Sequence, residues 1–147
     1  MKNAILFTTF NLLFQVAFYN CNAHKCNLIG NWTNELGSNM TIDKPTPGTN
    51  FNGFYFTAVT VQNGTVIQKS LLYGAENVQH SDQPVFGFVV NWSFTESISD
   101  FVGQCFVDGE GVEKLETMWL LRAKADSSGD NWKATRVGSN LFFRPNK

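Results

Sequence analysis

The stretch Phe86-Gly87-Phe88-Val89-Val90-Asn91-Trp92-Ser93-Phe94 decides the fold class that this sequence predicts. Every second residue of the stretch, from Phe86 to Phe94, carries a large apolar side chain, and Gly87, Asn91 and Ser93 are among the residues that alternate with them. Side chains two residues apart in a β-strand point to the same face of the sheet. The stretch therefore predicts a strand whose aromatic face is buried.

The segment 114–121 repeats this alternation with a second apolar face. Its odd positions, from Leu115 through Trp119 to Leu121, share one face, whereas Met118 and Leu120 lie on the other. An apolar patch on the outside of a barrel favours association with other subunits. Single apolar residues scattered over a protein surface are the ordinary alternative.

Strand-like runs separated by turn signals continue along the chain beyond residue 24, and no segment there has a sustained helical period. Asn63-Gly64 and Asp108-Gly109 are hairpin signals, because type I′ turns need positive φ at both central residues. Successive hairpins predict an all-β fold, an eight-stranded antiparallel up-and-down barrel, which leaves no exposed sheet edge. The predicted strands are 28–34, 39–42, 54–61, 66–72, 85–94, 97–107, 114–121 and 133–143.

The first residues of the chain have the features of a secretion signal. Lys2 precedes an apolar run from Ala4 to Phe18 that is too short and too interrupted to span a membrane. Cys21-Asn22-Ala23 then supplies the small residues that a signal peptidase reads. We therefore expect residues 1–23 to be a signal peptide and residues 24–147 to form one secreted β-barrel domain.

Removal of this segment leaves an even number of cysteines. Without Cys21, Cys26 and Cys105 remain, and an oxidising compartment favours a disulfide between them. N-x-Ser/Thr sequons agree with passage through the secretory pathway. Asn39 and Asn63 are the predicted glycosylation sites because Asn39 directly follows the first turn and Asn63 lies in turn-like sequence, whereas the sequons of Asn31 and Asn91 lie inside predicted strands.

Charge and motif spacing argue against several classes of function. The net charge of −1 provides no basic surface for a nucleic acid or an anionic membrane. Neither histidine, His24 nor His80, stands beside a nucleophile and an orienting group. No cluster has metal-ligand spacing, and no glycine-rich phosphate loop is present. We therefore predict a binding protein that is not an enzyme and holds no metal.

Polar residues interleaved with the aromatic ones predict the kind of ligand. Asn34 and Ser38 flank the first turn, Tyr55 and Thr57 share one face of a strand, and Asn140 lies in the apolar last strand. Each has an ordinary explanation as a turn residue or a satisfied core group. Buried hydroxyls and amides without partners cost roughly 1–3 kcal/mol each, so a barrel lined by several is expected to hold a polar ligand or ordered water.

Ordered motifs carry a family resemblance through nearly everything from Cys26 to Phe143. They are Gly30-Asn31-Trp32-Thr33-Asn34-Glu35-Leu36-Gly37-Ser38-Asn39-Met40, Tyr55-x-Thr57, the stretch 86–94, Gly103-Gln104-Cys105-Phe106, Thr117-Met118-Trp119-Leu120-Leu121-Arg122 and Trp132-Lys133-Ala134-Thr135-Arg136-Val137-Gly138-x-Asn140. Gly30-x-Trp32 alone also occurs in lipocalins, but the ordered set resembles the avidin family of biotin-binding proteins. With its cysteine pair, the chain is most similar to the vertebrate members.

This resemblance implies a barrel that binds biotin as a ligand with high affinity. It implies that Asn34, Ser38 and Tyr55 donate to the ureido oxygen, and that Thr57 and Asn140 accept from the ureido N–H groups. It also implies a homotetramer in which Trp132 reaches a neighbouring subunit's site, whereas Trp32 closes the barrel floor. The implied biotin-binding residues are Asn34, Leu36, Ser38, Tyr55, Thr57, Val59, Thr60, Val61, Gln62, Trp92, Phe94, Thr95, Ser97, Ser99, Phe101, Trp119, Leu121, Trp132 and Asn140.

The chain also departs from the family pattern. The loop 60–65 is bulkier and one residue longer than the usual avidin loop, and Ser139 stands where an apolar residue is expected at a subunit contact. A lipocalin-like carrier of a small hydrophobic ligand and a lectin-like surface module are the alternative functions. Biotin capture would suit antimicrobial defence by depletion of the vitamin.

Overall fold

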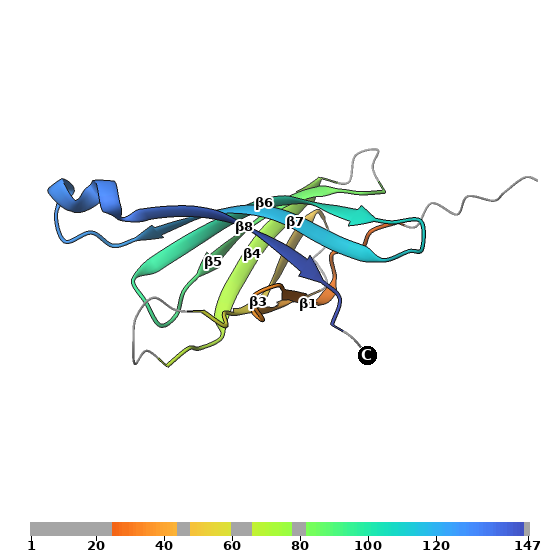
Figure 1. Cartoon of the computed structure of the whole chain (residues 1–147), viewed down its shortest axis with the longest axis horizontal. Helices are drawn as coiled ribbons and strands as arrows, with labels where there is room; N and C mark the ends of the chain where they lie inside the picture. Colours follow the sequence, from red (N-terminus) through yellow and green to blue (C-terminus); the bar gives the residue numbers. More distant parts are fainter. Residues whose placement is uncertain (1–24, 44–47, 60–65, 78–81, 146–147) are drawn as a thin grey trace, which may run out of the picture.

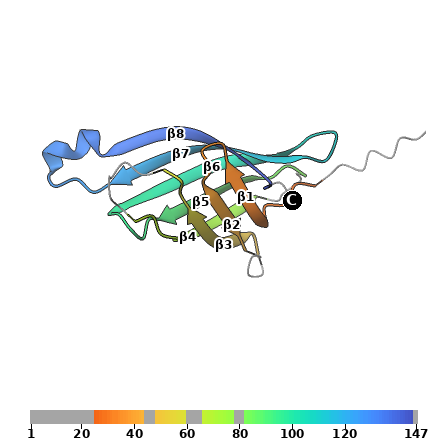
Figure 2. The same cartoon turned by 60° about the horizontal axis from the view of Figure 1, so that its bottom comes forward.

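The fold is a closed barrel in which each strand pairs antiparallel with its neighbours along the chain, and the last strand pairs with the first (Figures 1 and 2). The computed structural model describes residues 25–43, 48–59, 66–77 and 82–145. These residues confirm the predicted eight-stranded up-and-down barrel. Its strands are β1 Gly30–Asn34, β2 Asn39–Ile42, β3 Asn50–Phe56, β4 Ser70–Asn77, β5 Val85–Asn91, β6 Ser97–Val107, β7 Glu113–Ala123 and β8 Thr135–Phe143.

The boundaries of β3 and β4 differ from the predicted 54–61 and 66–72. Both strands include residues with low strand propensity, such as Asn52 in β3 and Gly74 in β4. Gly74 is required by a close approach, because a Cβ there would lie 2.5 Å from the ring of Phe51. The contact that selects glycine is made by a residue on another strand, so the local pattern does not show it.

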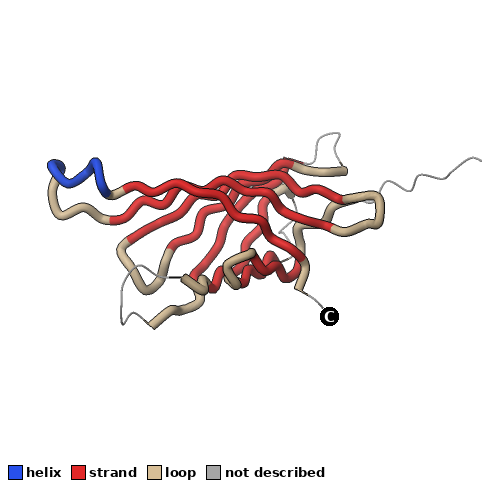
Figure 3. Tube along the Cα trace, in the orientation of Figure 1, coloured by secondary structure: helices blue, strands red, loops and turns tan. Residues whose placement is uncertain are grey.

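Two further elements differ from the expectation. The strand predicted over 85–94 ends at Asn91, so that Trp92 and Phe94 belong to the connection to β6. A short 3-10 helix, η1 Ser128–Lys133, precedes β8 and was not predicted. Figure 3 shows this helix in blue, at the far end of the β7–β8 connection. No helix in the described part of the chain is long and apolar enough to cross a membrane.

The hairpin predicted at Asp108-Gly109 forms, but its turn is not a two-residue type I′ turn. The connection from β6 to β7 runs over residues 108–112, and the positive φ of 81° belongs to Gly111. Asp108 closes the loop with its side chain, because Oδ1 accepts the backbone N–H groups of Glu110 and Val112, each at 2.9 Å. The Asp108 carboxylate thus stabilises a loop that is longer than a two-residue turn. The Asn63-Gly64 signal lies outside the described residues.

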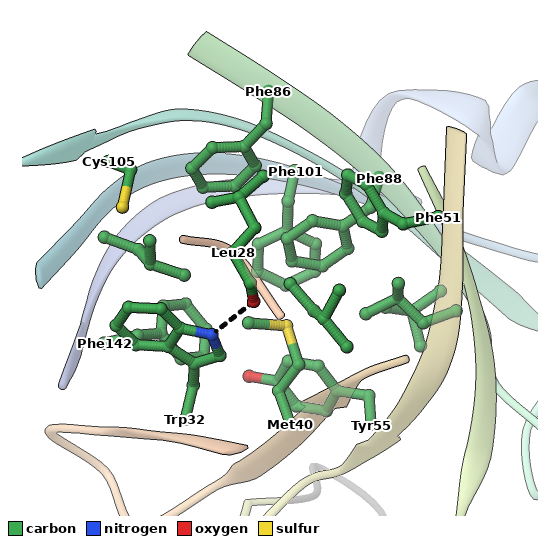
Figure 4. Packing of buried hydrophobic residues seen from close by; sticks show 14 of the residues in the cluster. Leu28, Trp32, Met40, Phe51, Tyr55, Phe86, Phe88, Phe101, Cys105 and Phe142 are labelled. Atoms are coloured by element: carbon green, nitrogen blue, oxygen red, sulfur yellow. Dashed lines mark hydrogen bonds between the residues drawn. The ribbon is translucent and has the colours of Figure 1, made fainter. Parts of the chain in front are cut away.

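The closed end of the barrel is built around Trp32, which is fully buried. Its Nε1 donates to the carbonyl oxygen of Leu28 at 2.8 Å, as Figure 4 shows beside Phe142. The guanidinium of Arg144 lies 3.8 Å from the centre of the indole ring. These contacts fill the floor, so the space available for a ligand lies at the opposite end.

The expected disulfide joins Cys26 to Cys105, both of which are buried. It ties the segment before β1 to the last residues of β6, 79 residues away along the chain. A crosslink that closes a loop of this length stabilises the fold by about 4 kcal/mol in the chain-entropy model. The predicted signal peptide 1–23, His24, His80 and the sequon of Asn63 lie outside the described residues.

Candidate ligand-binding site

The described residues enclose a cavity of about 590 Å³ at one end of the barrel. It opens where β1 ends and where the connections from β5 to β6 and from β7 to β8 begin, away from Trp32. Most of the side chains predicted to bind a ligand meet in this cavity. They are Asn34, Leu36, Ser38, Tyr55, Thr57, Val59, Trp92, Phe94, Thr95, Ser97, Ser99, Phe101, Trp119, Leu121 and Asn140.

Four of the predicted residues are not among the described residues that line the cavity. Thr60, Val61 and Gln62 lie outside the described residues. Trp132 is 81% exposed on η1, which Figure 1 shows beyond the ends of the strands, so it does not contribute to the cavity of its own chain.

The cavity mouth includes residues that the sequence analysis missed. They are Glu96, Ala123, Lys124, Asp126 and Arg136. The period-two pattern contained a signal for two of them, because Ala123 continues the face of Trp119 and Leu121 beyond the predicted end of the strand. In the same way Arg136 shares the face of Asn140.

Asn34 presents hydrogen-bond donors to the cavity. Its Oδ1 accepts the backbone N–H groups of Leu36 at 3.1 Å and Ser38 at 2.8 Å. Since the oxygen is occupied by two backbone donors, the amide nitrogen must point the other way, toward the hydroxyl of Tyr55 at 3.4 Å. The turn that ends β1 therefore fixes Asn34 as a donor.

Two hydroxyls are assigned opposite roles by their neighbours. Ser38 Oγ accepts the backbone N–H of Ala58 at 3.0 Å, so its proton is left to be donated to the neighbouring Tyr55 oxygen or to a ligand. Thr57 Oγ1 donates to the carbonyl oxygen of Val59 at 2.9 Å and accepts the backbone N–H of Val59 at 3.2 Å, so that toward a ligand it can only accept, with its second lone pair. Ser38 thus acts as a donor and Thr57 as an acceptor.

Asn140 is buried, and its amide is also held in one orientation. Its Nδ2 donates to Oε1 of Glu35 at 2.9 Å. A carboxylate offers only acceptors, so the amide nitrogen must face Glu35 and Oδ1 is left as the acceptor. Asn34 therefore presents its amide nitrogen to the cavity, whereas Asn140 presents its amide oxygen.

Tyr55 remains a neutral donor well into alkaline solution. Burial raises the pKa of its phenol to about 12, the hydrogen bond with Ser38 opposes this rise, and the nearby charge of Glu35 adds to it. The ring packs edge-on against Trp92, with centroids 5.4 Å apart, and stacks on Phe101 at 5.8 Å. Aromatic packing thus holds the hydroxyl in place before any ligand arrives.

Indole and phenyl rings form the apolar walls. Phe101 and Trp119 are directly opposite each other on β6 and β7. Trp119 lies over Gly138 on β8, where a Cβ would come within 2.4 Å of its ring. Trp92 Nε1 donates to Ser99 Oγ at 2.8 Å, which leaves the hydroxyl proton of Ser99 for another acceptor.

The polar lining differs in one respect from the expectation of unpartnered groups. Among the described residues, every buried side-chain nitrogen or oxygen already has a hydrogen-bond partner. Each of these polar groups can still form a further hydrogen bond, and the bond that it already makes fixes whether it donates to a ligand or accepts from it. A ligand would therefore add hydrogen bonds to groups that already have partners, and it would not supply the first partner of any of them.

The described residues contain no group of three or more histidine, cysteine or acidic side chains that could hold a metal ion. A closed antiparallel barrel with a cavity lined by polar groups and aromatic rings defines a small-ligand-binding barrel.

More specifically, the chain belongs to the avidin family, whose model matches residues 22–145. It is 53% identical to avidin of Gallus gallus over 123 residues, which cover 83% of this chain and 80% of that protein. Among solved structures, a biotin-binding protein from chicken superposes with a TM-score of 0.79 at 52% identity, covering 84% of this chain and 99% of the other. Xenavidin gives a TM-score of 0.78 at 45% identity, with coverages of 82% and 99%. The predicted family is thereby confirmed.

Proposed function

We propose that this chain binds biotin non-covalently and with high affinity, and that its task is capture instead of catalysis. A urea group presents a carbonyl oxygen that accepts hydrogen bonds and two N–H groups that donate them. The observation that carries the proposal is the matching polarity of the cavity. Asn34, Ser38 and Tyr55 carry donors, one of which serves the Ser38–Tyr55 hydrogen bond until a ligand oxygen takes its place, whereas Thr57 and Asn140 each keep an acceptor.

The remaining parts of biotin also have suitable partners. Trp92, Phe101 and Trp119 offer an apolar wall to the thioether ring, and the spare proton of Ser99 suits a sulfur acceptor. The hydroxyls of Thr95 and Ser97, 2.6 Å apart at the mouth, suit the carboxylate. Because the strands and loops hold these groups in place beforehand, binding costs little ordering of side chains.

Replacement of Tyr55 by phenylalanine tests the proposed donor set. The change removes one hydroxyl and keeps the ring that packs on Trp92 and Phe101. We expect biotin to dissociate about tenfold faster, because one hydrogen bond of roughly 1.4 kcal/mol is lost. The measurement is calorimetric titration with biotin followed by displacement kinetics, and Tyr73→Phe, at a position 55% exposed on β4, is the matched control.

The titration of the unchanged protein decides the proposal itself. No heat and no thermal stabilisation at saturating biotin would exclude biotin capture. Binding of retinol or a fatty acid in its place would favour a lipocalin-like carrier.

We further propose a homotetramer in which Trp132 completes a neighbouring site. The outer faces of β6, β7 and β8 carry exposed apolar side chains, among them Val102, Met118, Leu120 and Val137. A patch of this kind supports association between copies. Ser139, directly opposite Met118, interrupts it and weakens one of the expected contacts.

The exposed indole of Trp132 gives this assembly a second test. Trp132→Ala removes a side chain that packs little in its own subunit, so the stability of the subunit should not change. We expect biotin to leave the tetramer about tenfold faster, the effect of losing one apolar wall. Light scattering gives the oligomeric state and displacement kinetics the rate; an unchanged rate from an intact tetramer would contradict the exchange of Trp132.

Secretion after cleavage of residues 1–23, glycosylation at Asn39 and Asn63, and a role in antimicrobial defence complete the proposal. The side chain of Asn39 is exposed at the start of β2, which suits a glycan. Mass spectrometry of protein secreted from animal cells tests the cleavage and the glycans together.

A further inference from the structure

Glu35 is an exposed residue of the β1–β2 loop with its carboxylate turned back onto β8. Oε1 accepts from Nδ2 of Asn140 at 2.9 Å, and Oε2 accepts from the backbone N–H of Leu141, also at 2.9 Å. The backbone N–H of Glu35 itself donates to the carbonyl oxygen of Leu141 at 3.3 Å. Glu35 lies outside the cavity lining, so its hydrogen bonds affect a ligand through Asn140, while its charge also acts on the nearby phenol of Tyr55.

We propose that Glu35 is a positioning residue that sets the hydrogen-bonding polarity of the cavity at Asn140. This inference rests on the proposed binding of biotin. A free asparagine amide can turn over and exchange its donor for its acceptor at almost no cost in shape. Beside a carboxylate the two orientations are unequal, because turning over would bring the amide oxygen against a negatively charged oxygen. Glu35 therefore keeps Oδ1 available for a ureido N–H.

Among the described residues, Glu35 is the residue whose side chain contacts the Asn140 amide and can fix its orientation. Thr117 Oγ1 also approaches Asn140, at 2.9 Å, but it donates to the backbone carbonyl and does not touch the amide. The second bond of Glu35, to Leu141, holds the carboxylate in place along β8. The same side chain thus ties the loop to the strand and selects the amide orientation.

Glutamine at position 35 would reverse the selection. It has one acceptor atom, and the N–H of Leu141 needs it, so the glutamine NH2 group would face Asn140. The Asn140 amide would then rotate, so that its oxygen accepts from this NH2 group and its nitrogen points into the cavity. A ureido N–H would then meet a donor, although the shape of the site is unchanged.

A double-mutant cycle tests the inference. We expect Glu35→Gln to speed biotin dissociation about tenfold in the otherwise unchanged protein, and to have no effect in a background of Asn140→Ala, where no amide is left to orient. Glu35→Asp keeps both acceptor oxygens and should lose less than Glu35→Gln. Glu116→Gln is the matched control, since it removes an equal charge at a position opposite Leu141 on β7, where Glu116 pairs with Lys114 at the surface.

The outcomes separate this inference from the proposed function. If the unchanged protein shows no biotin binding, the proposed function fails. If it binds biotin but Glu35→Gln dissociates at the normal rate, or loses as much in the Asn140→Ala background, the positioning role alone is wrong. Melting of the ligand-free variants shows whether a loss is structural, because a positioning role requires faster dissociation from a protein as stable as the Glu116→Gln control.

Discussion

The substitution Asn34→Asp is expected to weaken biotin binding by about a thousandfold. The change is nearly isosteric, and the oxygen that accepts from Leu36 and Ser38 is retained. The amide nitrogen, however, becomes a charged oxygen facing the place where the ureido carbonyl would lie. Tyr55, 3.4 Å from that atom, would then donate its proton to the carboxylate and no longer to the ligand. The ligand loses the two donors of Asn34 and Tyr55, and its ureido oxygen faces a negatively charged oxygen. Together these changes cost about 4 kcal/mol.

Displacement kinetics and calorimetry measure this effect. Asn31→Asp is the control, because it adds the same charge on the same strand at a position exposed on the outer face, where its Oδ1 still accepts from Thr41. Both variants are best compared in unglycosylated protein, since Asn31 lies in a sequon. If Asn34→Asp binds biotin within tenfold of the control, Asn34 is not a donor to the ligand.

The walls of the cavity could be predicted from the sequence because strand alternation is a local property. The alternation in β7 correctly assigned Trp119 and Leu121 to the inside and Met118 and Leu120 to the outside. The large residues of the deciding stretch also face inward, even though the strand ends at Asn91 and the last of them lie in a loop.

The orientation of the polar groups could not be predicted in the same way, since it depends on contacts between distant parts of the chain. Glu35 and Asn140 are 105 residues apart, and Ser38 and Ala58 meet across two different loops. Composition and spacing identify which side chains carry donors and acceptors. Only the folded arrangement decides which atom of each group is already used. The same limit hid Glu35, which appears in the sequence as an ordinary turn residue.

Arg144 holds together several groups at the floor of the barrel beneath the cavity. Arg144 Nε lies 2.7 Å from Oε2 of Glu113, and its Nη1 donates to the carbonyl oxygen of Ile29 at 2.9 Å. Nη2 donates to the carbonyl oxygen of Asn27, and the guanidinium covers the ring of Trp32. The planar, multiply donating guanidinium suits this position better than an ammonium group would.

Arg144→Ala is therefore expected to lower the free energy of unfolding by about 3 kcal/mol. Removal of the cation leaves the Glu113 carboxylate, whose side chain is only 17% exposed, without its charged partner, and it leaves two carbonyl groups short of a donor. Guanidinium denaturation of the ligand-free protein measures the loss. Arg122→Ala is the matched control, because Arg122 makes exposed hydrogen bonds near η1, to Asn131 and Thr135. Equal stability of the two variants would mean that Trp32 and its neighbours close the floor without the cation.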